Sequence, residues 1–171
     1  LKETCLRSET TVKVFDQMRK LQGFTDEGSP GRDWNVATGM VIEGKAGFQI
    51  MGDWAKGEFT AAGKVPGVDY YCAATPSNNG YLYNVDSFIF YKSSDPDKQA
   101  GQKLLAKLMM GKNFQKVFNL YKGSIPARLD VSMDEFDKCA KTSNADIKTA
   151  GASGGLVPSF AHGMAQGNTM K

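Results

Sequence analysis

Residues 95–123 read DPDKQAGQKLLAKLMMGKNFQKVFNLYKG, and this stretch decides the fold class. Asp95 is a favourable N-cap, Pro96 suits the first position of a helix, and glycines at 111 and 123 mark two helix ends. Apolar residues recur between them at helical spacing. The stretch therefore predicts two consecutive helices, whose apolar faces consist of Leu104, Leu105, Leu108, Met109, Phe114, Val117, Phe118 and Tyr121.

Upstream of this pair, the pattern alternates between helix and strand. Residues 11–22 have helical spacing, residues 23–33 are rich in Gly, Pro and Asp and predict a loop, and Asp33 can cap a helix that ends at Gly44. Trp34 is on the apolar stripe of that helix, which favours a place in the core. A buried strand is expected at 46–51 (AGFQIM), followed by a short, weak helix at 54–63.

Strand-like segments also flank the helical pair. YYCAATP (70–76) is closed by the turn signal SNNG, and 81–92 is mostly apolar and aromatic. SIPARLDV (124–131) reads as extended, and SMDE (132–135) is a capping box that predicts a helix start. Short strands alternating with helices indicate an α/β fold, with helices 95–121 inserted between two extended stretches.

The amino-acid composition and charge argue against several classes of function. The 171 residues are 41% hydrophobic with a net charge of +3 from scattered lysines, so a nucleic-acid partner is not indicated. Every apolar run is too short to span a membrane.

The chain starts at Leu1 without Met or a signal-peptide pattern, from which we expect a processed, truncated or engineered start. Cys5, Cys72 and Cys139 permit one disulfide or three separate thiols, and with a single His no metal or cofactor site is expected.

Enzyme motifs are weak in this sequence. His162 has Ser159 nearby but no acid to complete a triad, and Asp53 with Glu58 is only one of many carboxylate pairs that could resemble a glycosidase site. The segment GASGG (151–155) lacks the lysine and spacing of a phosphate loop. We therefore expect no enzymatic activity.

Polar groups near the ends of the strand-like runs suit a sugar. Carboxylates and amides can bond to sugar hydroxyls, a Lys or His can donate, and an aromatic ring can cover the weakly apolar C–H face. Each residue also has a plainer interpretation, such as helix cap, core, turn or solvated side chain. The candidate set is Asp53, Trp54, Asn84, Asp86, Lys122 and His162.

Four separated motifs, GKAGFQIMGDWAKGEF, YNVDSFIFYK, YKGSIPAR and LVPSFAHGMA, carry a family resemblance. In this order they closely resemble the C-terminal half of the extracellular solute-binding proteins of sugar ABC transporters, above all the glucose/mannose type of Gram-negative bacteria. The resemblance covers essentially the whole chain. It implies two α/β lobes joined by hinge strands that close over a sugar, a periplasmic location, a hexose ligand and ABC permease subunits as partners.

The resemblance also implies roles for the candidate residues. Trp54 would stack on a sugar face while Asp53 accepts from its hydroxyls. Asn84 and Asp86 would bind the sugar at the hinge, and Lys122 and His162 would donate. It further implies a Cys72–Cys139 disulfide, leaving Cys5 unpaired.

The expected architecture is the C-terminal lobe of this two-lobe fold, a mixed sheet flanked by helices. Residues 1–84 would form its first part, 85–121 the hinge strand and helices of the absent N-terminal lobe, and 122–171 the return and tail. Helices lacking that lobe would expose their apolar faces, and the chain could form a homodimer through helices 95–121. The alternative hypothesis is therefore a self-associating, segment-swapped remnant with weak or no sugar binding.

Overall fold

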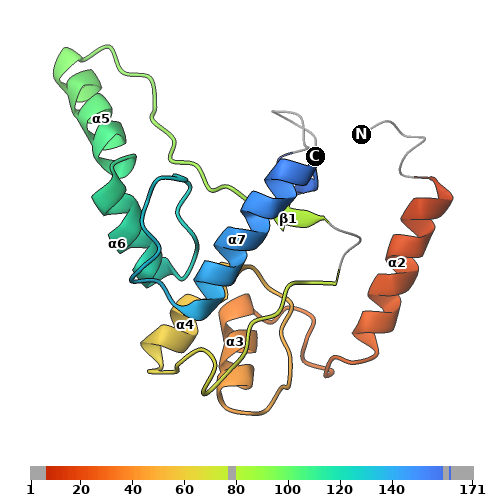
Figure 1. The fold of residues 1–171 in the computed structure, drawn as a ribbon. Helices are drawn as coiled ribbons and strands as arrows, with labels where there is room; N and C mark the ends of the chain where they lie inside the picture. Colours follow the sequence, from red (N-terminus) through yellow and green to blue (C-terminus); the bar gives the residue numbers. More distant parts are fainter. Residues whose placement is uncertain (1–6, 77–79, 160–161, 163–171) are drawn as a thin grey trace. The chain divides into compact units, whose positions relative to one another are not determined.

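The computed structural model describes residues 7–76, 80–159 and 162 (Figure 1). They belong to two compact units, one made of residues 1–33 and 158–171 and the other of residues 34–157. The boundaries predicted at 84/85 and 121/122 stay predictions. Cys5 and the turn at 77–79 lie outside the described residues.

In the first unit, α2 (Glu9–Gln22) confirms the helix predicted at 11–22. It begins two residues early because the Ser8 side chain caps it, accepting from the Thr11 amide at 3.3 Å. The loop after it is held by Asp26, whose carboxylate oxygens each accept a 2.6 Å hydrogen bond from Arg32. These bonds lower the pKa of Asp26 to about 2.

The second unit contains most of the predicted helices. Helix α5 begins where Asp95 accepts from the Asp97 amide at 2.9 Å, and α6 ends at Gly123, which has a left-handed φ of +89°. The helices of this unit are α3 (Trp34–Ile42), the 3-10 turn η1 (Asp53–Ala55), α4 (Lys56–Ala61), α5 (Pro96–Met109), α6 (Lys112–Lys122) and α7 (Lys138–Ser153).

The expected mixed sheet is reduced to two strands in the described part of the chain. Strand β1 (Tyr81–Tyr83) pairs with β2 (Leu156–Pro158). The prediction of strands at 46–51 and 70–76 was wrong, since neither segment forms a strand. A strand exists only when a neighbour exchanges backbone hydrogen bonds with it. Apolar side chains in such segments are exposed instead, Phe48 by 95%.

A small core lies where α6 and α7 meet the segment between them. Val131, Phe136 and Ala140 are buried there, and Leu120, Ile125 and Met133 pack against them. The helix start predicted from the capping box at 132–135 was also wrong. Ser132 only makes a local turn, accepting from the Asp134 amide at 3.2 Å, while Asp137 caps α7 by accepting from the Ala140 amide at 2.8 Å.

Two contacts tie α4 and the segment after it to the start of α7, and a third joins α4 to that segment. Cys72 and Cys139 form the disulfide that the family resemblance implied, with a Cα–Cα distance of 5.7 Å. Lys56 pairs with Asp137, and the ring of Phe59 stacks on Tyr70 with centroids 4.1 Å apart. Helix α4 and the segment after it are thereby held against the start of α7, next to the core.

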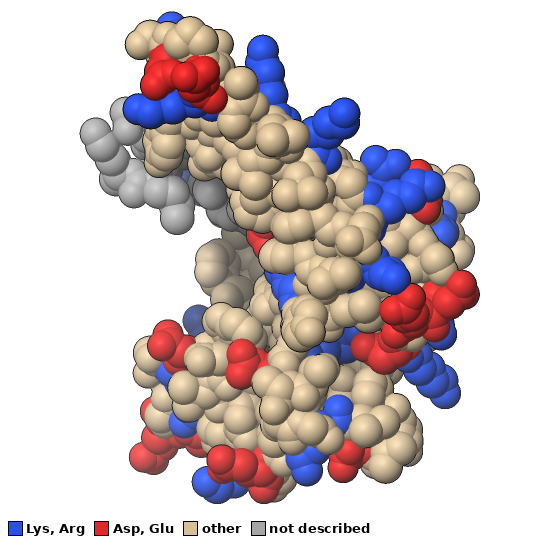
Figure 2. Space-filling view, turned by 90° about the vertical axis from the view of Figure 1, so that its left-hand side faces the viewer, with Lys and Arg blue, Asp and Glu red and all other residues tan. Residues whose placement is uncertain are grey.

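Helices α5 and α6 present an apolar surface that the described residues do not cover. Leu104 is 70% and Leu108 60% exposed, and Leu105, Val117 and Tyr121 are also exposed. The space-filling view of the side where these helices lie shows a broad uncharged area with Lys and Arg at its margins (Figure 2). This is the exposed apolar surface expected from the sequence.

Candidate functional site

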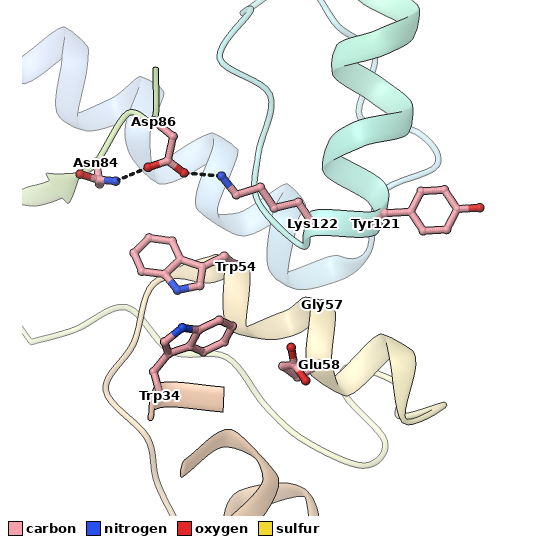
Figure 3. Close-up of a pocket in the computed structure, with 8 residues that line it drawn as sticks. All are labelled: Trp34, Trp54, Gly57, Glu58, Asn84, Asp86, Tyr121 and Lys122. Carbon is pink, nitrogen blue, oxygen red and sulfur yellow. Dashed lines mark hydrogen bonds and ion pairs between the residues drawn. The ribbon is translucent and has the colours of Figure 1, made fainter. Parts of the chain in front are cut away.

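A pocket of about 420 Å³ lies within the second unit, between the start of α3, the η1–α4 turn, the segment after β1 and the end of α6 (Figure 3). Four of the six predicted ligand residues line it, although they are spread over about 70 positions of sequence. The lining residues are Trp34, Trp54, Gly57, Glu58, Asn84, Asp86, Tyr121 and Lys122.

One wall of the pocket is a chain of polar groups. The Asn84 side-chain amide donates to one oxygen of Asp86 at 3.1 Å, and the Lys122 ammonium lies 2.5 Å from the other (Figure 3). The Asp86 side chain is 65% exposed and keeps surface for a ligand, while that of Lys122 is 30% exposed. The Lys122 nitrogen also lies 5.8 Å from the centroid of the Phe118 ring. This wall thus offers donors and acceptors side by side.

The other wall carries two indoles. Trp54 projects from η1 and Trp34 from the first residue of α3, and both lie below the polar chain in Figure 3. Gly52 makes room for Trp54, because a Cβ at Gly52 would collide with the six-membered indole ring. An apolar wall facing a polar one can cover a ligand that has both kinds of surface.

Trp34 is not the core residue that its helical stripe suggested. It is 41% exposed, since it stands at the very start of α3, where one side of the helix opens to the pocket. Its carbonyl oxygen accepts from Gln49 Nε2 at 2.9 Å, and the buried Thr38 hydroxyl lies 3.0 Å from the same oxygen. These contacts fix the backbone that carries the indole.

Asp53 and His162 are not in the pocket lining. The Asp53 carboxylate accepts from the Ile125 amide at 3.1 Å, so it binds backbone 72 residues further along the chain. His162 belongs to the other unit, where it is exposed and its amide donates to the Ser159 carbonyl at 3.0 Å. Its predicted role stays a prediction.

The structure adds lining residues that the sequence reading did not assign to this site. Glu58 lies four positions after Trp54, a spacing that brings two side chains to the same face of a helix. Tyr121 directly precedes Lys122, but its ring points away from the other labelled side chains in Figure 3. There it contributes to an adjoining apolar pocket of about 540 Å³ with Phe114, Val117 and Phe118.

The charge of Asp53 also affects the pKa of a nearby tyrosine, Tyr81. Burial raises the pKa of Tyr81, the charges of Asp53 and Asp146 raise it further, and a 2.6 Å hydrogen bond to Ser143 opposes them.

Among the described residues, no cluster of His, Cys, Asp and Glu could hold a metal ion. Nor is any described helix long and apolar enough to cross a membrane.

Comparisons with known proteins identify the family of this chain. Residues 1–149 match the family described as bacterial extracellular solute-binding protein. A probable sugar-binding periplasmic protein of Brucella suis is 47% identical over 97% of this chain and 39% of its own length. A protein of the same name from Rhizobium meliloti is 44% identical over 100% of this chain and 41% of its own.

A more distant relative, the xylose/arabinose-binding protein of Haloferax volcanii, is 31% identical over 77% of this chain and 28% of its own length. The relatives are named as binding proteins and not as enzymes. The chain spans about two fifths of the length of the Brucella and Rhizobium relatives.

Proposed function

The chain belongs to the family of bacterial extracellular solute-binding proteins, and we propose that it is part of the non-catalytic, periplasmic component of an ABC importer that binds a glucose- or mannose-like hexose. The pocket in the second unit is the proposed sugar site. One observation carries the proposal: Trp54, Asn84, Asp86 and Lys122, chosen from the sequence for sugar chemistry, line a single pocket.

The pocket chemistry supports a sugar over a purely apolar ligand. Asp86 can accept from two hydroxyls, the Lys122 ammonium can donate, and the Asn84 amide can do both. Trp54 and Trp34 offer faces for the C–H side of a pyranose. A volume of about 420 Å³ is within the roughly 300–1,000 Å³ typical of ligand pockets.

The exposed surface of α5 and α6 supports a second part of the proposal. We expect the remainder of a binding protein of the relatives' length to cover Leu104, Leu108 and Phe118 and to supply the opposite wall of the sugar cleft. Closure of the two lobes would then exclude water and present the liganded form to the permease subunits. The alternative occupant of this surface is a second copy of the chain.

Calorimetric titration with glucose, mannose and galactose tests the sugar proposal. Micromolar binding of a hexose is expected, with at least about a tenfold loss in Trp54→Ala and in Lys122→Met, a change of about 1.4 kcal/mol. Lys112→Met is the matched control, since Lys112 pairs with Asp130 on the surface 3.0 Å away. No heat with any hexose, together with a dimeric mass in solution, would favour the self-associating alternative.

An enzymatic role has its own test. We expect no turnover of glycosides by the chain. Turnover that disappears in Asp53→Asn or Glu58→Gln would contradict the binding-protein proposal and restore the glycosidase alternative.

A further inference from the structure

Helices α4 and α6 approach each other at a glycine. Gly57 lies in the first turn of α4, and a Cβ placed on it would lie 2.9 Å from the Lys122 carbonyl oxygen and 3.2 Å from that of Tyr121. Both obstacles are backbone atoms, which cannot rotate away as a flexible side chain can. Only glycine at position 57 permits the observed approach.

A second glycine faces the first across the same contact. A Cβ on Gly123 would lie 2.6 Å from the Gly57 nitrogen and 3.1 Å from the Lys56 Cβ. Gly123 also has a φ of +89°, a conformation that side chains strongly disfavour. We call this contact between Gly57 and Gly123 the α4–α6 joint.

Asp53 binds the backbone just after the α4–α6 joint. Its Oδ2 accepts from the Ile125 amide at 3.1 Å, two residues after Gly123. Asp53 belongs to the η1 turn that also carries Trp54, so the hydrogen bond connects the indole wall to the end of α6. Through this bond Asp53 holds the backbone that follows α6, and Asp53 is not among the residues that line the pocket.

The joint and the Asp53 bond fix the pocket's two walls relative to each other. A Cβ on Gly57 would lie 2.9 Å from the carbonyl oxygen of Lys122 itself, and Gly57 lies in the same short segment as Trp54 and Glu58, which both line the pocket (Figure 3). We propose that Asp53, Gly57 and Gly123 are positioning residues that place the Lys122 ammonium over the sugar site. The inference rests on the proposed function of the pocket.

The substitution Gly57→Ala tests the joint directly. Pushing the Lys122 carbonyl away should weaken glucose binding by about tenfold or more, since small displacements of polar groups remove their hydrogen bonds. Gly101→Ala is the matched control: Gly101 is also helical, but a Cβ there meets nothing within 4 Å. Its glucose affinity should stay within about twofold of the original.

A double-mutant cycle separates positioning from general destabilisation. If Gly57 acts through Lys122, then Gly57→Ala should cost little further affinity in a protein that already carries Lys122→Met. Full additivity of the two losses would overturn the proposal, because it would mean that Gly57→Ala acts elsewhere.

A second measurement needs no sugar. The Lys122 nitrogen lies 5.8 Å from the Phe118 ring centroid, so the ring current of Phe118 affects the proton signals of the Lys122 side chain in NMR spectra. Gly57→Ala should shift the Lys122 ε-methylene signals and Gly101→Ala should not. Unchanged signals would overturn the positioning role even if no sugar bound. Absence of glucose binding by the original chain with shifted signals in Gly57→Ala would instead count against the proposed function alone.

Asp53 provides an independent pair of variants. Asn at position 53 can still accept from the Ile125 amide, whereas Ala cannot. Asp53→Ala should therefore reduce glucose affinity and speed hydrogen exchange of the Ile125 amide, and Asp53→Asn should largely restore both. Equal loss of affinity in the two variants, with Ile125 still protected in Asp53→Asn, would make Asp53 a direct sugar ligand and overturn its positioning role.

Discussion

Lys56 and Asp137 are 81 positions apart, yet the Lys56 ammonium lies 2.7 Å from Asp137 Oδ2. The Lys56 side chain is 7% exposed and that of Asp137 is 33% exposed. The other oxygen of Asp137 caps α7 through the Ala140 amide. One carboxylate thus joins α4 to the start of α7.

Removing the buried ammonium should destabilise the second unit. Lys56→Met leaves Asp137 without its charged partner, and we expect the free energy of unfolding to fall by about 2–3 kcal/mol, less than for a fully buried pair because Asp137 is partly solvated. Urea denaturation measures the change. The matched control is Lys116→Met, which breaks a surface pair with Glu135 at 2.8 Å and should cost less than about 1 kcal/mol. Similar losses in both variants would contradict this account.

The Cys72–Cys139 disulfide should leave one thiol in the sequence. Thiol titration of the denatured, unreduced protein should detect one sulfhydryl per chain, which we assign to Cys5; three would refute the pairing. The bond spans 67 positions of sequence. Its reduction should lower the free energy of unfolding by about 4 kcal/mol if loop entropy of the unfolded chain dominates.

Tyr70 should make stability depend on alkaline pH. Burial, and secondly the charge of Asp137, raise its pKa to about 12 from 10.0. Because the folded state holds this proton more tightly, the resulting stability is complete below pH 10 and is lost as the pH rises from 10 to 12. Tyr70→Phe should remove this loss relative to the original protein, as denaturation across that pH range would show.

The same Tyr70 variant should not weaken the fold at neutral pH. The Tyr70 hydroxyl is buried without a hydrogen-bond partner in the described structure, although its ring stacks on Phe59. Phenylalanine keeps the stack and removes the unsatisfied group, so we expect a gain of about 1 kcal/mol. A clear loss of stability at pH 7 would indicate a hydrogen bond to the hydroxyl.

The apolar surface of α5 and α6 should control self-association. If a second copy covers it, the isolated chain will show a mass that rises with concentration in analytical ultracentrifugation, and Leu104→Gln with Leu108→Gln will restore the monomer. Lys103→Gln with Lys107→Gln is the matched control on the same helix. A monomer at every concentration would exclude the homodimer.

The helices could be predicted from sequence because their signals are local. Asp95, Pro96 and Gly123 mark ends through bonds within a few residues, and apolar spacing marks the faces. The strands at 46–51 and 70–76 could not, because composition shows that a segment suits a sheet but not whether a neighbour is present to pair with it. The capping box at 132–135 failed for a related reason: Asp137 offered a competing cap next to residues needed in the core.

For the candidate site, the sequence indicated the residue types better than it indicated their positions in space. Family motifs pointed to Trp54, Asn84, Asp86 and Lys122, which do share a pocket. Trp34 was misread because helical spacing cannot show that the first residue of a helix faces an opening. Asp53 has a carboxylate suited to a hydroxyl, but the fold brings the Ile125 amide, 72 positions away in sequence, within its reach.

The chain has only two tryptophans, and both line the same pocket. Its ultraviolet emission at long wavelength therefore originates from that pocket alone, with no background from indoles elsewhere. A molecule that binds between the two walls of the pocket should therefore change the wavelength or the intensity of the tryptophan fluorescence, and no added label is needed to detect it.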